Sequence, residues 1–130
     1  MNKFVIDAYA WIEYFDGTKS GEEARKIIEN PNNSISTSVI TIAELLSHFR
    51  RKKQDFQEAK KVLSSLSAFY PINSEFAEEA GLLHADIKSK NRHFGLADTF
   101  VLLTAKKLNA KVLTGDEDFR EIKEAILIKN

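Results

Sequence analysis

Apolar residues recur along the chain with two different spacings, and the pattern predicts short strands alternating with helices. Phe4-Val5-Ile6 is a continuous apolar run, which is typical of a strand buried on both faces. Strands are predicted at 3–6, 33–37, 69–72, 111–114 and 125–128. Helices, marked by apolar residues at a helical period, are predicted at 8–15, 21–29, 38–53, from 54 or 55 to about 66, 74–87 and 96–108, with one helical turn at 119–123.

This alternation predicts an α/β fold with a mostly parallel sheet that helices cover on both faces. Pro71 removes a ladder donor, so the strand around it is expected at the edge of the sheet. Ser20, Ser38 and Ser74 are the predicted N-caps of three helices, and Glu23 completes a capping-box pattern with Ser20. With 130 residues and no Gly/Ser/Pro-rich linker, the chain is expected to form one domain over 1–130.

Composition narrows the possible chemistry. The chain has no cysteine, which excludes disulfides, thiolate metal sites and a cysteine nucleophile. Its 19 basic and 19 acidic side chains cancel, so any attraction for nucleic acid must be local. There is no apolar run of about 18 residues and no signal-peptide pattern, so a cytoplasmic protein without a membrane span is expected.

Two aspartates are placed at the same edge of the predicted sheet. Asp7 ends the first strand, and Asp116 follows the strand 111–114 after a single glycine. In an open α/β sheet, ligands bind beyond the carboxyl ends of the strands. Asp7 and Asp116 are therefore candidates for a shared site.

Two further acids occupy helical positions that face inward. Asp98 heads the apolar stripe formed by Val101, Leu102 and Ala105, and Glu44 stands among apolar residues in the first two turns of its helix. A carboxylate on an inward stripe is costly unless it has a partner. Such a partner is either a hydrogen-bond donor or a metal ion.

Converging carboxylates repel one another, and a divalent cation removes that repulsion. An all-oxygen set without cysteine or paired histidines suits Mg²⁺ or Mn²⁺. Asp118 is a possible fifth acid or orients a metal-bound water, and the hydroxyls of Thr114 and Ser38 are candidates for supporting the ligands.

Each acid also has an ordinary structural explanation. Asp7 would serve as a helix N-cap, Asp98 as a first-turn partner of the helix dipole, and Asp116 as a turn residue, while Glu44 would be a plain helix glutamate. The metal-site hypothesis therefore depends on the four acids together.

Four segments carry a resemblance to a known family. They are Phe4–Trp11, Thr41–Leu45, Leu96–Phe100 and Leu113–Phe119. They span nearly the whole chain in the family's order, and the chain resembles the PIN-domain nucleases, most closely the toxins of the VapC type.

The resemblance implies a three-layer α/β/α sandwich with a central parallel sheet. It also implies Mg²⁺- or Mn²⁺-dependent endoribonuclease activity on single-stranded RNA, by in-line attack of a metal-activated water. The family's acids fall on Asp7, Glu44, Asp98 and Asp116, of which Asp7, Asp98 and Asp116 are the predicted metal ligands; Asp118 matches a frequent additional acid. The implied partners are an antitoxin protein and a second copy of the chain.

Two basic runs are candidates for contacts with RNA phosphates. The residues predicted to bind RNA are Arg50, Arg51, Lys52, Lys90 and Arg92. The alternative is that these are solvated parts of a helix end and a loop. Phe94 would stack on a base or pack in the core, and the aromatics at 9, 11, 14 and 15 would pack in the core or cover a partner surface. His84 is predicted to pack and His48 to lie on a helix surface.

Two other functions were weighed. A non-catalytic PIN-like module that binds RNA or protein shares the fold without the chemistry. Phosphoryl-transfer domains also use a strand-end aspartate, but the phosphatase type needs a second Asp where this chain has Tyr9, and a receiver domain needs a lysine that 114–116 does not supply.

Overall fold

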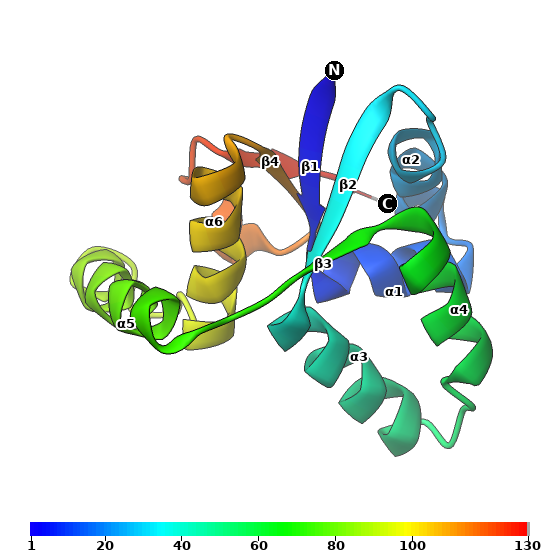
Figure 1. Ribbon diagram of the computed structural model, residues 1–130, viewed down its shortest axis with the longest axis horizontal. Coiled ribbons are helices and arrows are strands. Elements are labelled where there is room, and N and C mark those ends of the chain that lie inside the picture. The colour runs from blue at the N-terminus through cyan, green and yellow to red at the C-terminus, as the bar shows by residue number, and fades with distance from the viewer. Residues whose placement is uncertain (130) are drawn as a thin grey trace.

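The computed structural model describes residues 1–129 and is built on a five-stranded parallel sheet. The strand order is β3-β2-β1-β4-β5, so the first strand lies at the centre (Figure 1). The strands are β1 (Asn2–Ile6), β2 (Asn33–Ser38), β3 (Ala68–Tyr70), β4 (Lys111–Thr114) and β5 (Ala125–Leu127). β3 lies at the edge of the sheet, as expected from the neighbouring Pro71.

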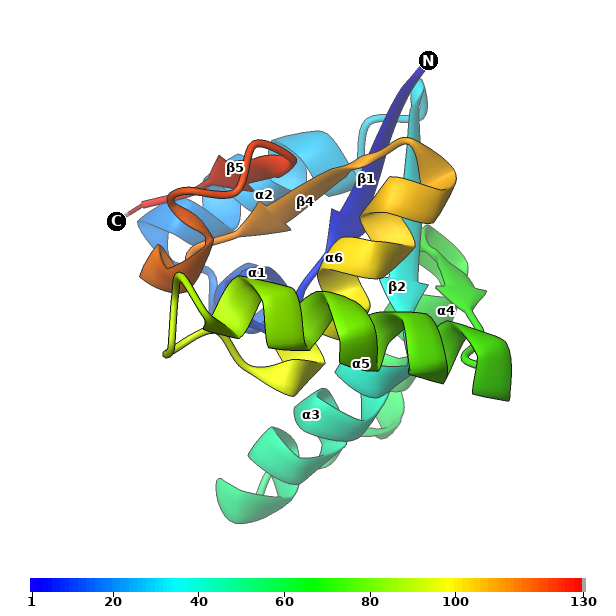
Figure 2. The same cartoon turned by 90° about the vertical axis from the view of Figure 1, so that its left-hand side faces the viewer.

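Helices cover both faces of this sheet, which gives the predicted three layers (Figures 1 and 2). The helices are α1 (Ala8–Asp16), α2 (Lys19–Ile28), α3 (Val39–Arg51), α4 (Gln57–Leu66), α5 (Ser74–Lys88) and α6 (Leu96–Leu108), with a 3₁₀ turn η1 (Glu117–Phe119). Among the described residues, no helix has the length and apolar character needed to cross a membrane.

The alternation of side chains along β1 divides the core in two. Phe4 and Ile6 belong to a buried cluster with Trp11 of α1, whereas Val5 belongs to a cluster on the other face with Leu102 of α6. A central strand buried on both faces explains why the first apolar run shows no polar alternation.

Two predicted helix caps are wrong. Thr18, and not Ser20, caps α2 by accepting a hydrogen bond from the Gly21 amide at 3.0 Å. Asn73, one residue before Ser74, caps α5. The cap of α3 is confirmed: the Ser38 hydroxyl accepts from the Ile40 amide at 3.3 Å.

The aromatic residues of α1 pack mostly inward. Trp11 is fully buried and donates through Nε1 to the Thr37 hydroxyl at 3.1 Å, and Tyr14 is buried beside it. Phe15 is half-buried and packs on the same cluster, while Tyr9 is 43% exposed. Core packing therefore accounts for three of these four aromatics.

Candidate metal centre

Asp7 lies at the point where β1 gives way to α1. One of its oxygens, Oδ1, accepts a hydrogen bond from the Ala10 amide at 2.9 Å, so the residue is the N-cap of α1. Its carboxylate is also hydrogen-bonded to the side chain of Thr114 at the end of β4, and the residue is only 6% exposed. The neighbouring strand thus holds this carboxylate at the carboxyl edge of the sheet.

Asp116 follows β4 and caps η1. Its Oδ1 accepts from the Asp118 amide at 2.9 Å, and its own amide donates to the Thr114 hydroxyl at 3.0 Å. Thr114 is fully buried and links the two strand-end aspartates. Gly115, between Thr114 and Asp116, leaves room for the ring of Tyr9: a Cβ there would lie 2.2 Å from a ring carbon, so a larger residue would displace that ring.

Asp98 reaches the same edge from the first turn of α6. Its Oδ2 accepts a hydrogen bond from the amide of Gly95, the residue before the helix, at 3.1 Å. This bond satisfies one of the free amides at the helix start and fixes the direction of the carboxylate.

Three carboxylates come together at this edge. Asp98, Asp116 and Asp118 each offer an oxygen, and within the described part of the chain these oxygens lie within 4.8 Å of one another. Asp118, predicted as a fifth acid or as a residue that orients a metal-bound water, stands in this closest group, whereas Asp7, a predicted ligand, does not. The Asx-type bond from its amide to Asp116 turns the chain back and brings it there.

Asp7 and Glu44 interact electrostatically with carboxylates of this group. Burial raises the pKa of Asp7 to about 7; hydrogen bonds from Thr114 and Ala10 oppose the shift, and the charges of Asp98 and Asp116 add to it. Burial also raises the pKa of Glu44, and the charge of Asp98 raises it further, although the residue as a whole is exposed.

Asp98 shows the same behaviour at the centre of the group. Burial first, and then the charges of Asp116 and Asp118, raise its pKa to about 6, against the effect of the Gly95 hydrogen bond. The charges that most affect these acids are those of other carboxylates. This all-oxygen set fits a divalent cation such as Mg²⁺ or Mn²⁺, which would replace the mutual repulsion by attraction.

A clamp between two loops positions the group. Phe94, just before α6, and Phe119 of η1 are both fully buried, and their ring centroids lie 5.0 Å apart. Asn91 donates through Nδ2 to the backbone carbonyl of Asp118 at 3.2 Å. Sequence reasoning missed Asn91, because nothing near it along the chain marks a contact 27 residues away.

The clamp also settles two predictions. Phe94 packs in the core and is not available to stack on a base. His84 is half-buried, with Nε2 3.1 Å from the carbonyl oxygen of Phe94, in keeping with its predicted packing role.

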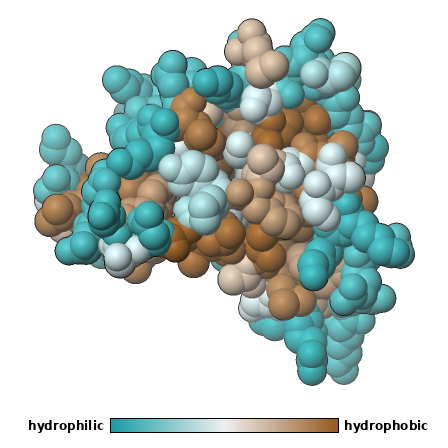
Figure 3. Space-filling view, in the orientation of Figure 1, coloured by the Kyte–Doolittle hydropathy of each residue, from teal (hydrophilic) through white to brown (hydrophobic). Residues whose placement is uncertain are grey.

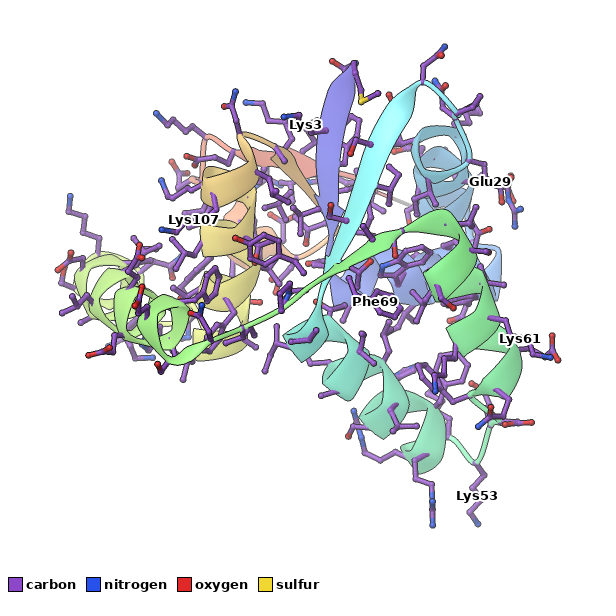
Figure 4. All side chains as sticks on the ribbon, viewed as in Figure 1. Lys3, Glu29, Lys53, Lys61, Phe69 and Lys107 are labelled. Atoms are coloured by element: carbon purple, nitrogen blue, oxygen red, sulfur yellow. The ribbon has the colours of Figure 1, made fainter. Side chains whose placement is uncertain are left out.

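The two basic runs differ in position. Lys90 and Arg92 are exposed on the loop that Asn91 ties to Asp118. Arg50, Arg51 and Lys52 are exposed at the far end of α3, beside Lys53, which Figure 4 labels at the end of that helix. Ser38, at the opposite end of α3, holds the start of the helix that carries Glu44.

Comparisons with known proteins agree with this architecture. Residues 4–125 match the model of the PIN domain family. A search of curated proteins found no relative of the chain.

Among solved structures, the chain is similar to a toxin–antitoxin complex from Klebsiella pneumoniae, with 24% identity, 94% of each chain covered and a TM-score of 0.74. It is also similar to VapBC2 from Rickettsia felis bound to a promoter DNA fragment (20%, 96% of each chain, 0.73). A third is VapC20 of Mycobacterium tuberculosis, a toxin that cleaves the sarcin-ricin loop (15%, 92% of this chain and 95% of that one, 0.73). These likenesses confirm the predicted PIN-like α/β/α fold.

Proposed function

This chain belongs to the PIN-domain family, and on that premise we propose that it is a metal-dependent endoribonuclease, the cytoplasmic toxin of a toxin–antitoxin pair. The observation that carries the proposal is the convergence of Asp98, Asp116 and Asp118, whose oxygens lie within 4.8 Å of one another in the described chain. Asp7 and Glu44 adjoin this group, and their pKa values are raised by burial and by the charge of Asp98.

In this proposal Asp7, Asp98 and Asp116 hold Mg²⁺ or Mn²⁺, and Asp118 lies beside them. When bound, such a cation activates water and stabilises the charge that develops on a phosphodiester under in-line attack. Thr114 keeps Asp7 and Asp116 in register through its two hydrogen bonds. Glu44, the exposed member of the set, is the carboxylate that can accept a hydrogen bond from an incoming water.

Single-stranded RNA is the proposed substrate, and cations beyond the acids would bind its backbone. Lys90 and Arg92 lie on the loop attached to Asp118 and would bind phosphates close to the cleaved bond. Arg50, Arg51 and Lys52 would bind more distant phosphates.

A protein partner is proposed from the apolar surface. Large apolar side chains stay exposed on the helices that carry Glu44 and Asp98 and on α5: Val39, Leu46, Leu82 and Leu96. Hydrophobic residues also gather in the middle of the face shown in Figure 3, around β3, where Phe69 is 39% exposed. A cognate antitoxin and a second copy of the chain are the proposed partners for such surfaces.

A nuclease assay tests the function. With Mg²⁺ or Mn²⁺, the chain should cleave single-stranded RNA, and EDTA should abolish cleavage. Asp7→Asn and Asp98→Asn should each lower the rate by at least about a hundredfold, the scale seen when one charge-stabilising group is removed. Asp86→Asn, an exposed residue of α5, is the matched control and should cleave normally.

Two results would contradict the proposal. Unchanged cleavage by both aspartate variants would show that the site is placed wrongly. RNA binding without cleavage in either metal would point to a non-catalytic PIN-like module.

A further inference from the structure

A recess of about 480 Å³ lies between the loop that follows α5 and the segment that follows η1. Ile87 and Ile122 give it apolar walls, and Lys90, Arg92 and Glu121 are among the polar residues that line it. We propose that this loop recess binds one nucleobase of a single-stranded RNA, next to the phosphate that is cleaved. The inference rests on the proposed function and deepens it by naming a base-binding subsite.

The position of the loop recess is the first argument. Asn91 lines it and at the same time donates to the backbone carbonyl of Asp118, at 3.2 Å. One lining residue of the recess is therefore bonded directly to the backbone of the turn that carries Asp118. We therefore expect that a nucleotide whose phosphate lies at the carboxylates can place its base in the loop recess.

The chemistry of the lining is the second argument. A base is flat and apolar on its faces, and two isoleucines offer aliphatic surface to such faces. Because Phe94 is buried, stacking falls to the planar groups of Arg92 and His93, which are both exposed. The cations around the opening suit the phosphates on either side of the bound base.

Glu121 adds a preference among bases. An ionised carboxylate only accepts hydrogen bonds, so it favours a base that presents an amino group. Adenine, cytosine and guanine carry an exocyclic amino group. Uracil has none, and its one donor, N3–H, lies between two carbonyl oxygens that repel a carboxylate. The loop recess is therefore expected to disfavour uridine.

Other hollows fit this role less well. The grooves beside α4, lined by residues such as Phe49, Gln54 and Asp55, lie along the C-terminal half of α3, away from the acidic turn. The loop recess combines cations, apolar walls and, through Asn91, a hydrogen bond to the backbone of Asp118.

Cleavage of a randomised single-stranded RNA library with Mn²⁺ is the first test. The wild-type chain should disfavour uridine at one fixed position beside the cut. Glu121→Gln, which adds an amide donor, should raise cleavage at uridine by at least about fivefold relative to the other bases. His93→Ala, which removes a planar group of the lining and no phosphate-binding cation, should raise KM several-fold with kcat unchanged. Glu78→Gln and Lys60→Ala, at exposed positions outside the loop recess, should leave both readouts unchanged.

Binding without metal is the second test, and it does not depend on activity. Addition of AMP, CMP or GMP to the full chain in EDTA should shift the amide NMR signals of Asn91, His93 and Ile122, and UMP should shift them less. The signals of Gln54 and Asp55, in the groove beside α4, are the internal control.

The outcomes separate the two proposals. If RNA is cleaved but the variants keep the wild-type base preference and KM, the base-binding subsite is refuted and the nuclease stands. If no RNA is cleaved with either metal, the nuclease proposal fails, and the nucleotide-induced shifts alone decide whether the loop recess binds a base. Absence of shifts at 91, 93 and 122 would overturn the subsite in either case.

Discussion

At the scale of single residues, a structural role and a metal-binding role are compatible in the same carboxylate. Asp7, Asp98 and Asp116 each use one oxygen to accept a backbone amide near a helix start, at 2.9, 3.1 and 2.9 Å. A carboxylate has two oxygens and can accept further bonds. The capping explanations considered from the sequence therefore describe how each acid is aimed, and they do not compete with a metal site.

Substitution of Asp7 by Asn tests the cost of its buried charge. Its pKa rises from 3.8 to about 7 on folding, so between these values the native state holds more protons and stability falls as pH rises. Asn keeps the N-cap without the charge. In EDTA at pH 8, Asp7→Asn should be more stable than wild type by up to about 4 kcal/mol, at about 1.4 kcal/mol per pKa unit.

Urea denaturation at pH 8 and pH 4 measures this difference. At pH 4 the Asp7 carboxyl is protonated in the native state, so the two proteins should have nearly equal free energies of unfolding. Asp86→Asn, at an exposed position, should show no such change with pH. An Asp7→Asn variant that is equally destabilised at both pH values would refute the explanation.

The N-cap of α2 shows where a sequence pattern fails to specify a single residue. Ser20 fits a capping box with Glu23, but Thr18 two residues earlier has the extended backbone of a cap and takes the Gly21 amide. Both hydroxyls are hydrogen-bonded to Glu13 at 2.8 Å. When two residues that favour the N-cap position lie two positions apart, the sequence pattern does not specify which of them is the N-cap.

At the scale of elements, the pairing of α1 with α2 depends on one small residue. A Cβ on Gly21 would lie 1.9 Å from the backbone carbonyl oxygen of Glu13, so only glycine permits this approach. Gly81, in the middle of α5, has no atom within 4 Å of a built Cβ. Substitution of these two glycines by alanine should therefore change the free energy of unfolding in opposite directions.

Gly21→Ala should therefore destabilise the protein and Gly81→Ala should stabilise it. Overpacking against backbone costs about 1–3 kcal/mol or more. Replacing an unhindered glycine within a helix gains about 0.5–1 kcal/mol. The free energies of unfolding from urea titrations measure both, and a destabilisation by Gly81→Ala as large as that by Gly21→Ala would contradict the packing argument.

The clamp is a second relation between elements. Phe119→Leu keeps an apolar side chain but loses the edge contact with Phe94 and leaves buried volume unfilled, so stability should fall by about 1–3 kcal/mol. Mn²⁺ binding, measured by calorimetry, should weaken several-fold, because the turn that holds Asp116 and Asp118 loosens. Phe69→Leu, on the exposed edge strand, should leave Mn²⁺ affinity unchanged, and equal effects of both variants would refute the clamp.

Elements with a strong period were predictable, and the contacts between them were not. The helix 96–108 and the strand 111–114 have the predicted bounds, since each combines a clear apolar pattern with clear end signals. The bond from Asn91 to Asp118 depends on how two loops meet in space. No local pattern encodes such a meeting, which is why the sequence did not reveal that Asn91 contacts the turn of Asp118.

At the scale of the whole molecule, a chain with zero net charge still concentrates carboxylates at one place. The carboxylates with raised pKa values lie at the carboxyl edge of the sheet, whereas the cations of the α5–α6 loop and of the far end of α3 are exposed outside this group. Concentrated negative charge destabilises the metal-free fold at neutral pH, and a cation that binds only the folded chain reverses this effect.

Divalent metal should therefore stabilise the folded chain, and more strongly at high pH. At a concentration about 100 times its Kd, Mn²⁺ should add about 2.7 kcal/mol to the free energy of unfolding at pH 8. At pH 5, below the pKa of about 7 of Asp7 and about 6 of Asp98, protons compete for the ligands and the gain should shrink. Thermal unfolding at matched ionic strength in KCl measures the effect, and Asp98→Asn should lose it. An equal gain in Asp98→Asn would mean that the ion binds elsewhere, because this variant lacks one of the three proposed ligands.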